Sequence, residues 1–281
     1  MIRRAGFHAD AFGIFRHVVL LLGAAVMLAP FVWMIATSFK PPQEIFSGEL
    51  TLLPRQWHAW ENYHKAFTKV PMLRYLVNGV VVTSAIFLLQ MLVAVPCAYA
   101  LAKLDFRGRG FIFALMLFGL LIPAHVPAIP LYIMLWKVGL LNTYAALVIP
   151  FVISVFGIFL MRQFFKSIPD DLIHAARLDG LSELSIVWRI MVPAAMPALI
   201  SFGIFSVVAH WNDYFWPLLV INSRELAPPP LGVAYFRNEE AGHDFGPLMA
   251  GAVIITAPLV VAFLLAQRRF IEGMTMSGLK G

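Results

Sequence analysis

The stretch Ile168-Pro169-Asp170-Asp171-Leu172-Ile173-His174-Ala175-Ala176-Arg177-Leu178-Asp179-Gly180 interrupts a chain that is otherwise mostly apolar. It continues to Pro193 and combines basic residues with an amphipathic helical pattern. Gly180 is suited to the left-handed conformation in which many helices end. The stretch, called the elbow below (residues 168–193), is therefore predicted to form two short helices that meet at Gly180, between two membrane spans.

Serines and apolar residues predict the limits and faces of these two helices. Ser167 is expected to cap the first helix, because a serine that precedes a helix can accept a bond from a backbone N–H. Leu172, Ala175 and Ala176 recur at helical spacing and are expected to share one face. Ser182 is expected to begin the second helix, with an apolar stripe of Leu184, Val187, Trp188 and Met191. Such an element is either an amphipathic connector at the membrane surface or a docking element for a separate subunit.

The composition assigns the chain to the membrane proteins. Of its 281 residues 60% are hydrophobic and 13% are charged, and the mean hydropathy is +0.81, whereas soluble domains contain about 25% charged residues. Inside a bilayer only helices and closed barrels satisfy their own backbone hydrogen bonds. Because the apolar runs are long, the sequence predicts an all-α, polytopic membrane protein. The single cysteine, Cys97, cannot form an intramolecular disulfide.

Six apolar segments are each long enough to cross the membrane, since about 20 helical residues span the ~30 Å hydrocarbon layer. Their predicted limits are 17–39, 74–101, 110–136, 143–163, 194–221 and 246–267. The first segment follows several arginines but is longer than the apolar core of a typical signal peptide, so it is interpreted as a span. No repeat or soluble module is recognisable. Residues 1–281 are therefore predicted to form one transmembrane domain, with the elbow between spans four and five.

The distribution of basic residues predicts the orientation of the chain. If the N-terminus lies inside, thirteen of the 21 lysines and arginines fall in inner segments and eight fall in outer segments. Cytoplasmic loops of membrane proteins usually carry the excess of these residues. Both termini and the elbow are therefore predicted to be cytoplasmic. The net charge of +6 is attributed to this orientation rather than to nucleic-acid binding.

Several motifs of common enzymes are absent from the sequence. It has no Gly-x-x-x-x-Gly-Lys-Ser/Thr phosphate loop, no His-Glu-x-x-His and no Cys-x-x-Cys. The chain is therefore not expected to be an enzyme, and no catalytic, cofactor-binding or metal-binding residue is assigned to it.

The elbow resembles the cytoplasmic loop of permease subunits of binding-protein-dependent ABC importers, whose pattern is Glu-Ala-Ala, then Asp-Gly, then Leu-Pro. The matching residues are Ala175, Ala176, Asp179, Gly180, Ile190 and Pro193, with a lead-in at Pro169 and Leu172. His174 stands where the family usually has glutamate, and Val192 where it has leucine. The resemblance implies that a partner ATPase couples to this loop. The residues implied in coupling are Pro169, Leu172, His174, Ala175, Ala176, Asp179, Gly180 and Pro193, although His174 does not supply the family's carboxylate.

Other segments resemble the maltose-type, carbohydrate-transporting branch of this family. They include Thr37–Glu44 and the C-terminal tail, so the resemblance extends over nearly the full length. In that branch the tail reaches into the cleft between two ATPase subunits, which implies contacts from Gln267, Arg268, Gly273, Thr275 and Lys280. From the residues alone, the tail could equally be a frayed end.

Two groups of residues in the spans are candidates for the wall of a translocation pathway. Pro123 and Pro127 in span three free backbone carbonyls, which suits either a hydrated pathway wall or a kink needed for packing. In span five, Asn212, Asp213 and Tyr214 could bind sugar hydroxyls and stack on a sugar ring. They could instead belong to an aromatic belt at the outer surface of the membrane, because position 213 lies about 29 Å along a helix that begins at residue 194.

The resemblance implies a passive half-channel in an ATP-driven importer for a sugar or oligosaccharide. The implied partners are a second related permease, two cytoplasmic ATPase subunits that hold ATP and Mg²⁺, an extracytoplasmic solute-binding protein and membrane lipid. The implied location is the cytoplasmic (inner) membrane of a bacterium or archaeon. Two alternatives stay open. One is a secondary transporter driven by an ion gradient, a class that usually shows inverted repeats and buried charges; the other is an ABC permease for glycerol phosphate or another non-sugar solute.

Overall fold

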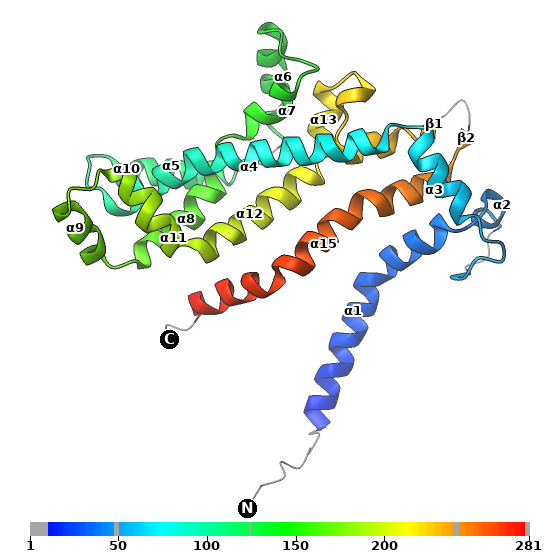
Figure 1. Ribbon diagram of the computed structural model, residues 1–281, viewed down its shortest axis with the longest axis horizontal. Helices are drawn as coiled ribbons and strands as arrows, with labels where there is room; N and C mark the ends of the chain where they lie inside the picture. The colour runs from blue at the N-terminus through cyan, green and yellow to red at the C-terminus, as the bar shows by residue number, and fades with distance from the viewer. Residues whose placement is uncertain (1–10, 48–50, 124, 239–241, 279–281) are drawn as a thin grey trace, which may run out of the picture. The chain divides into compact units, whose positions relative to one another are not determined.

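A computed structural model describes residues 11–47, 51–123, 125–238 and 242–278 (Figure 1). Within these ranges the regular structure is almost entirely helical. The exception is a short antiparallel pair, β1 (Arg237–Asn238) and β2 (Gly242–His243). Several helices are apolar and long enough to cross a bilayer. The predicted all-α class is confirmed.

The helices belong to two compact units. The first unit contains residues 1–69 and 236–254, and the second contains residues 70–235 and 255–281. One of the boundaries between them falls inside the last helix, α15 (Phe245–Gly278). The single transmembrane domain over residues 1–281 stays a prediction.

The first unit is organised around the end of α1 (Ala11–Ser38), which α2 (Pro42–Ile45) and α3 (Ala59–Thr68) follow along the chain. The side-chain amide of Asn62 donates to the backbone oxygens of Ser38 and Lys40, each at 2.9 Å, and so ties α3 to the end of α1. Lys40 is buried, and its ammonium group binds Thr51. The Thr37–Glu44 segment, part of the family resemblance, is therefore a packed junction.

Three helices form the core of the second unit (Figure 1): α4 (Met72–Lys103), α8 (Val155–Ser167) and α12 (Met196–Trp211). α4 packs against both α8 and α12. α8 and α12 meet at Gly157, where an added β-carbon would lie 2.4 Å from the ring of Phe202. The absence of a side chain at Gly157 lets these two helices approach closely.

Shorter helices complete the second unit. They are α5 (Arg109–Gly119), α6 (Ala128–Lys137), α7 (Tyr144–Val148), η1 (Ile149–Phe151), α13 (Phe215–Val220), η3 (Arg224–Leu226) and α14 (Pro229–Ala234). The elbow contributes α9 (Asp170–Leu178), α10 (Glu183–Ile186), η2 (Val187–Met191) and α11 (Val192–Ala194). The amide of Asn78 donates to the oxygens of Glu225 and Ala227, at 2.8 and 3.0 Å, and fastens the loop before α14 to α4.

Three helical segments are long and apolar enough to cross a membrane: Gly13–Ser38, Met72–Lys103 and Phe245–Leu265. Two bent helix pairs meet the same criterion together. They are Tyr144–Phe151 with Val155–Ser167, bent by 44°, and Glu183–Ala194 with Met196–Trp211, bent by 85°. The described residues thus contain three to five candidate spans, and the count of six stays a prediction.

Helices end inside three of the predicted spans, so these segments are not continuous helices, and their limits as membrane spans stay a prediction. In 110–136, α5 ends at Gly119 and α6 begins only at Ala128, and two prolines between them lack the N–H that a continuous helix needs. In 143–163, the hydroxyl of Ser154 accepts from the N–H of Gly157 at 3.0 Å and starts a new helix. In 194–221, α12 stops at Trp211 and α13 begins at Phe215. Apolarity predicted the segments but not these breaks.

Candidate functional site

The elbow contains two helical arms that meet at a glycine, as predicted: α9 forms the first arm, and the consecutive elements α10, η2 and α11 form the second. Gly180 has φ +80°, in the left-handed region. Its N–H donates to the oxygen of Arg177 at 3.0 Å, and the N–H of Leu181 donates to the oxygen of Ala176 at 3.0 Å, which closes the end of α9. An added β-carbon at Gly180 would meet no heavy atom within 4 Å. The backbone conformation, rather than lack of space, therefore favours glycine here.

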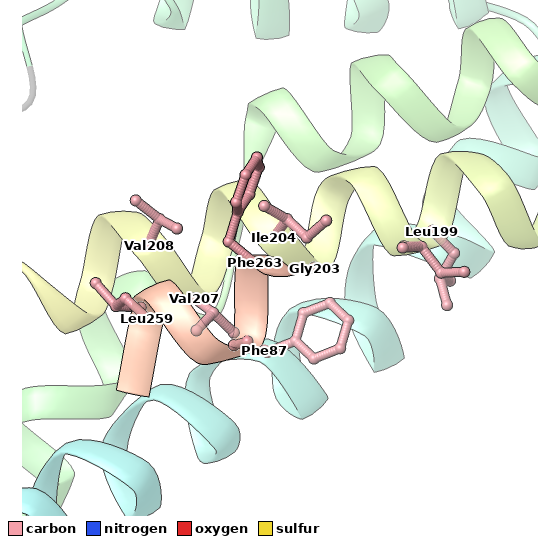
Figure 2. A pocket seen from close by; sticks show the side chains of 10 residues that line it. Phe87, Leu199, Gly203, Ile204, Val207, Val208, Leu259 and Phe263 are labelled. Atoms are coloured by element: carbon pink, nitrogen blue, oxygen red, sulfur yellow. The ribbon is translucent and has the colours of Figure 1, made fainter. Parts of the chain in front are cut away.

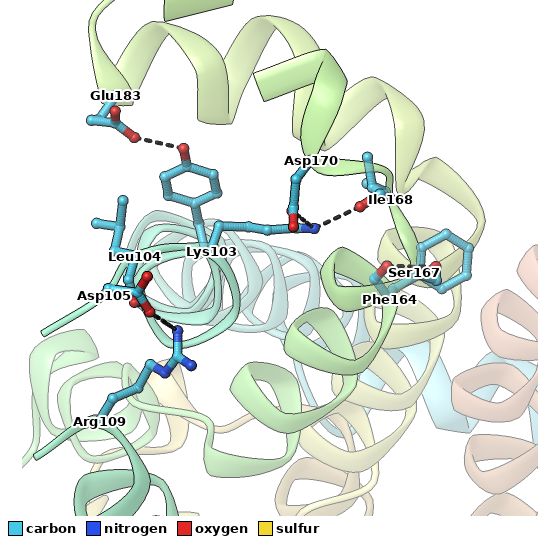
Figure 3. A network of polar contacts seen from close by, with 10 residues as sticks. Lys103, Leu104, Asp105, Arg109, Phe164, Ser167, Ile168, Asp170 and Glu183 are labelled. Atoms are coloured by element: carbon cyan, nitrogen blue, oxygen red, sulfur yellow. Dashed lines mark hydrogen bonds and ion pairs between the residues drawn. The ribbon is translucent and has the colours of Figure 1, made fainter. Parts of the chain in front are cut away.

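The two expected serine caps have different outcomes. Ser167 does not cap α9, because it is the last residue of α8 and its hydroxyl donates to the oxygen of Phe164 at 2.7 Å (Figure 3). α9 begins instead after Pro169, with two aspartates in its first turn, where negative charge is favourable. Ser182 does cap α10, since its hydroxyl accepts from the N–H of Ser185 at 3.4 Å.

The apolar residues of α9 divide between two faces. Ile173 and Ala176 are buried in the core of the second unit, whereas Leu172 and Ala175 are exposed. The predicted common face of Leu172, Ala175 and Ala176 was therefore wrong. Leu172, Ala175 and Leu178 follow one another at three-residue spacing and form an outward side, with Leu172 50% and Leu178 89% exposed. These three residues are called the exposed face of α9.

The second arm of the elbow is more deeply buried than the first. Two residues of the predicted apolar stripe, Val187 and Met191, lie in the core, and Trp188 packs against it. Leu184, the fourth residue of that stripe, is exposed. Ile186 takes its place in the core.

Lys103, the last residue of α4, binds the beginning of the elbow. Its ammonium group donates to the backbone oxygen of Ile168 at 2.6 Å and to the carboxylate of Asp170 at 2.5 Å (Figure 3). The Lys103 side chain is only 6% exposed, and a buried charge requires such partners. Sequence reasoning used Lys103 only as a sign of orientation and missed this contact.

Tyr99 and Arg177 converge on the carboxylate of Glu183. The Tyr99 hydroxyl donates to Oε2 at 2.5 Å. The Arg177 guanidinium donates to Oε1 from Nε at 2.8 Å and to Oε2 from Nη2 at 3.2 Å. Arg177 lies in the last turn of α9 and Glu183 is the first residue of α10. The carboxylate thus bridges the two arms of the elbow and joins them to α4. No local sequence motif predicts this contact, because it joins segments that are distant in the sequence.

The carboxylates of Asp170 and Glu183 are stabilised in their ionised form. The hydrogen bonds from Arg177 and then from Tyr99 lower the pKa of Glu183. The hydrogen bond from Lys103 lowers the pKa of Asp170. Both ion pairs are therefore present at neutral pH.

The candidate pathway residues of span five lie at the turn between α12 and α13. A carboxylate oxygen of Asp213 accepts from the backbone N–H of Trp216 at 3.2 Å, which helps α13 to start. The side-chain amide of Asn212 donates to the oxygen of Val208 at 2.8 Å, so it closes the end of α12. Tyr214 is exposed.

A pocket of about 220 Å³ lies beside this turn. Its lining combines aromatic and polar side chains with three apolar ones: Phe151, Phe215, Trp216, His125, His210, Asp213, Ala128, Leu131 and Ala209. Of the predicted pathway residues only Asp213 lines it; Pro123, Pro127, Asn212 and Tyr214 do not. Sequence reasoning assigned no pathway role to the two histidines. Within the described residues, no three His, Cys, Asp or Glu side chains are grouped to hold a metal ion.

Gln90 connects α4 to the helices around this pocket. Its amide nitrogen donates to the oxygen of Phe151 at 2.8 Å and lies 3.3 Å from Nε2 of His210. Its amide oxygen accepts from the hydroxyl of Ser206 at 2.6 Å. A glutamine in the middle of an apolar span is a signal that sequence reasoning could have used.

A second cavity, of about 320 Å³, lies between α4, α12 and α15 (Figure 2). Its ten lining residues are all apolar and include Phe87, Gly203 and Phe263. With no hydrogen-bonding side chain, this cavity is unsuited to a sugar.

The predicted tail lies largely beyond the described side chains. α15 continues to Gly278, so the backbones of Arg268, Gly273 and Thr275 are helical. The side-chain amide of Gln267 donates to the oxygen of Leu264 at 3.1 Å. Lys280 lies outside the described residues.

The chain is similar to permeases of known transport systems. It is 33% identical over 260 residues to the arabinooligosaccharides transport system permease protein AraQ of Halalkalibacterium halodurans, which covers 92% of this chain and 93% of the relative. It is 30% identical over 271 residues to the sn-glycerol-3-phosphate transport system permease protein UgpE of Escherichia coli, which covers 94% of this chain and 96% of the relative.

The fold is similar to that of a solved importer. The match is to a chain in the crystal structure of a bacterial ABC transporter involved in the import of the acidic polysaccharide alginate. The TM-score is 0.80 at 26% identity, over 96% of this chain and 100% of that chain. The family model described as "Binding-protein-dependent transport system inner membrane component" matches residues 73–275, from α4 through the elbow into the last helix. As the elbow motif predicted, the chain belongs to the family of binding-protein-dependent transport system inner membrane components.

Proposed function

We propose that this chain is one permease subunit of an ATP-driven importer and forms half of the pathway for a sugar or oligosaccharide. Its relative AraQ is named for arabinooligosaccharide transport, and the similar solved importer carries alginate. In this proposal ATP and Mg²⁺ bind to two separate cytoplasmic ATPase subunits. The chain itself catalyses no reaction and changes conformation when those subunits close.

The observation that carries this proposal is the exposed face of α9. Leu172, Ala175 and Leu178 present an apolar strip on a helix whose opposite side is buried in the core. Such a strip, rimmed by the polar residues His174 and Asp179, is suited to a groove on a partner protein. The exposed residues through which we propose that the ATPase docks are Leu172, His174, Ala175, Leu178, Asp179 and Gly180.

The other residues implied in coupling act from behind this surface. Ala176 is buried, so we assign it to the packing that holds α9 against the core rather than to the partner contact. Pro169 precedes α9 and Pro193 lies in α11, and each limits the backbone conformations at one end of the elbow.

The pocket beside Asp213 is the proposed place where this subunit meets its solute. Phe151, Phe215 and Trp216 offer aromatic surfaces for the apolar face of a sugar ring. Asp213 and the two histidines, His125 and His210, offer acceptors and donors for hydroxyl groups. The aromatic belt at the membrane surface is the competing explanation for the same residues, and substitution of Asp213 distinguishes the two.

The remaining parts of the proposal concern the assembly. The chain crosses the inner membrane six times with both termini in the cytoplasm, beside a second permease that completes the pathway. An extracytoplasmic binding protein delivers the solute. The C-terminal tail, including Gln267, Arg268, Gly273, Thr275 and Lys280, contacts the ATPase subunits.

Reconstitution tests the proposed function directly. The chain is purified gently from membranes with the proteins that accompany it, and the complex is placed in liposomes with its binding protein. Uptake of an oligosaccharide that requires both ATP and the binding protein is expected. A ligand panel that includes glycerol 3-phosphate tests the cargo suggested by UgpE. The chain alone, under a cation gradient, should accumulate nothing, and strong accumulation would establish a secondary transporter instead.

A further inference from the structure

We infer that Tyr99 and Lys103 are positioning residues that fasten the elbow to α4, so that α4 moves with the elbow and carries its displacement to the pocket beside Asp213. The inference rests on the proposed function, in which an ATPase subunit docks on the elbow. It adds a mechanical route through one particular helix and assigns roles to residues of α4 and α10.

The two fastening residues lie on one face of the end of α4. Tyr99 and Lys103 are four residues apart, which places them one above the other on a helix. Lys103 binds Ile168 and Asp170 at the start of α9 (Figure 3). Tyr99, which is 2% exposed, binds the first residue of α10. One helix face therefore holds the beginnings of both arms of the elbow.

The carboxylate of Glu183 fixes the angle between these arms. It binds Arg177 on one side of Gly180 and Tyr99 on α4. An added β-carbon at Gly180 would meet no heavy atom within 4 Å, so the surroundings do not by themselves immobilise the turn. The bidentate pair with Arg177 does so by joining the end of α9 to the start of α10.

Apolar packing supports the same connection. Ala98 and Tyr99 of α4 share one buried core with Ile173 of α9 and Ile186 of α10. A packed core transmits displacement because it has few voids in which side chains could yield. The polar contacts then prevent the elbow from sliding along α4.

α4 also reaches the pocket. Gln90 lies nine residues before Tyr99, about 14 Å along the helix at 1.5 Å per residue. Its amide contacts His210, which lines the pocket, and the backbone of Phe151, which lines it too. A shift of α4 would therefore move groups that surround the solute. The connected elements are, in order, the exposed face of α9, the Tyr99 and Lys103 contacts, α4, Gln90 and the pocket.

The test measures coupling in the complete importer, with ATPase subunits and binding protein, in proteoliposomes. Tyr99→Phe removes one hydroxyl and keeps the ring in the core. A hydrogen bond to a charged group changes an equilibrium by roughly tenfold or more. We expect the variant to keep its ATPase subunits and to hydrolyse ATP, while the number of solute molecules imported per ATP falls about tenfold.

Tyr144→Phe is the matched control. The Tyr144 hydroxyl also makes a short hydrogen bond, 2.6 Å to the side-chain oxygen of Asn78, but it lies away from the elbow. The control should keep the wild-type number of solute molecules per ATP. An equal fall in both variants would mean that any lost hydroxyl weakens coupling, which would overturn the specific role of Tyr99.

Lys103→Met provides an independent variant, and it decides the question if Tyr99→Phe fails to reach the membrane. It should show the same loss of import per ATP with ATPase subunits still bound. Wild-type coupling in either properly assembled variant would overturn the inference. Loss of the ATPase subunits would also overturn it, because the residues would then serve assembly. If the wild-type complex itself shows no ATP-dependent uptake, the proposed function fails instead.

Discussion

Gly157 of α8 and Phe202 of α12 are in such close contact that a single added β-carbon at Gly157 would lie 2.4 Å from the Phe202 ring. Phe202 is 1% exposed, so its ring has no free space into which to turn. The contact sets the distance between two of the three core helices in the second unit. This contact predicts that the core tolerates no larger side chain at position 157.

Gly157→Ala is expected to destabilise the folded protein by about 1–3 kcal/mol, the usual cost of overpacking a core. Thermal unfolding in detergent, followed by circular dichroism, measures the change. Gly110→Ala in α5 is the control, because a β-carbon there meets no heavy atom within 4 Å. A double variant, Gly157→Ala with Phe202→Leu, should recover part of the loss. Equal stability of wild type and Gly157→Ala would contradict the close packing.

Gly180→Glu is expected to weaken the association of the ATPase subunits while the protein still inserts in the membrane. The substitution places a bulky charge beside the exposed face of α9 and adds strain of about 1–2 kcal/mol, because a residue with a side chain is disfavoured at φ +80°. Co-purification of the ATPase subunits is the measurement.

Gly108→Glu is the matched control for this substitution. Gly108 also has a positive φ, +87°, and open space around it, but it lies before α5 rather than in the elbow. It should suffer the same backbone strain and keep its ATPase subunits. Equal losses in the two variants would mean that strain, rather than docking at the elbow, causes the effect.

Asp213→Asn separates the pathway from the aromatic belt. Asparagine can still accept the N–H of Trp216, so α13 should form normally and only the charge is lost. If Asp213 binds sugar hydroxyls, uptake at low solute concentration should fall about tenfold or more, since hydrogen bonds to a charged group contribute about 1.5–3 kcal/mol. Solute uptake by the complete importer is the measurement. Near-normal uptake would favour the belt.

Asp213→Ala gives a further comparison at the same position. It removes both the charge and the acceptor for the Trp216 N–H, so it should also cost about 1 kcal/mol of stability. If Asp213→Ala unfolds at a lower temperature than wild type but transports the solute normally, the role of Asp213 is purely structural.

Acid is expected to release the bridge at Glu183. Its pKa is lowered in the folded state by Arg177 and then Tyr99, so the carboxylate stabilises the fold fully at pH values above its unfolded pKa of about 4.3. This stabilisation is lost as the pH falls through the lower folded pKa. The unfolding temperatures of wild type and Glu183→Gln should therefore differ at pH 7 and converge in acid. Glu61→Gln, at an exposed position of α3, serves as the control. If the difference in unfolding temperature between wild type and Glu183→Gln were the same at pH 7 and in acid, the bridge would be refuted.

Local sequence was sufficient to predict the structure wherever a single residue determines the backbone conformation at its own position. Gly180 was predicted to end a helix in the left-handed conformation and does so, and Ser182 was predicted to begin the next helix and caps it. The class of the protein also followed from the sequence, because a largely apolar chain has few folds open to it in a bilayer. The elbow motif led to the right family.

Local sequence was insufficient wherever two partners compete for one residue. Ser167 has a side chain that can cap a following helix, yet it bonds back into α8. Leu172, Ala175 and Ala176 fit one helix face by spacing, yet the core receives Ala176 with Ile173 and leaves the other two outside. The rotation of a helix about its axis depends on what it packs against, and that information is not contained in the helix itself.

The sequence by itself determined a helical membrane protein of the importer-permease family, with a glycine turn between two short helices. Only the tertiary structure decided which side of α9 faces outward and which residues hold the elbow. Tyr99 and Glu183 are 84 positions apart in the sequence. That separation alone does not predict a contact, because many pairs of residues equally far apart are not in contact. The contact between Tyr99 and Glu183 exists because α4 and α10 pack on a common core, and such packing depends on the whole arrangement of helices rather than on any single segment.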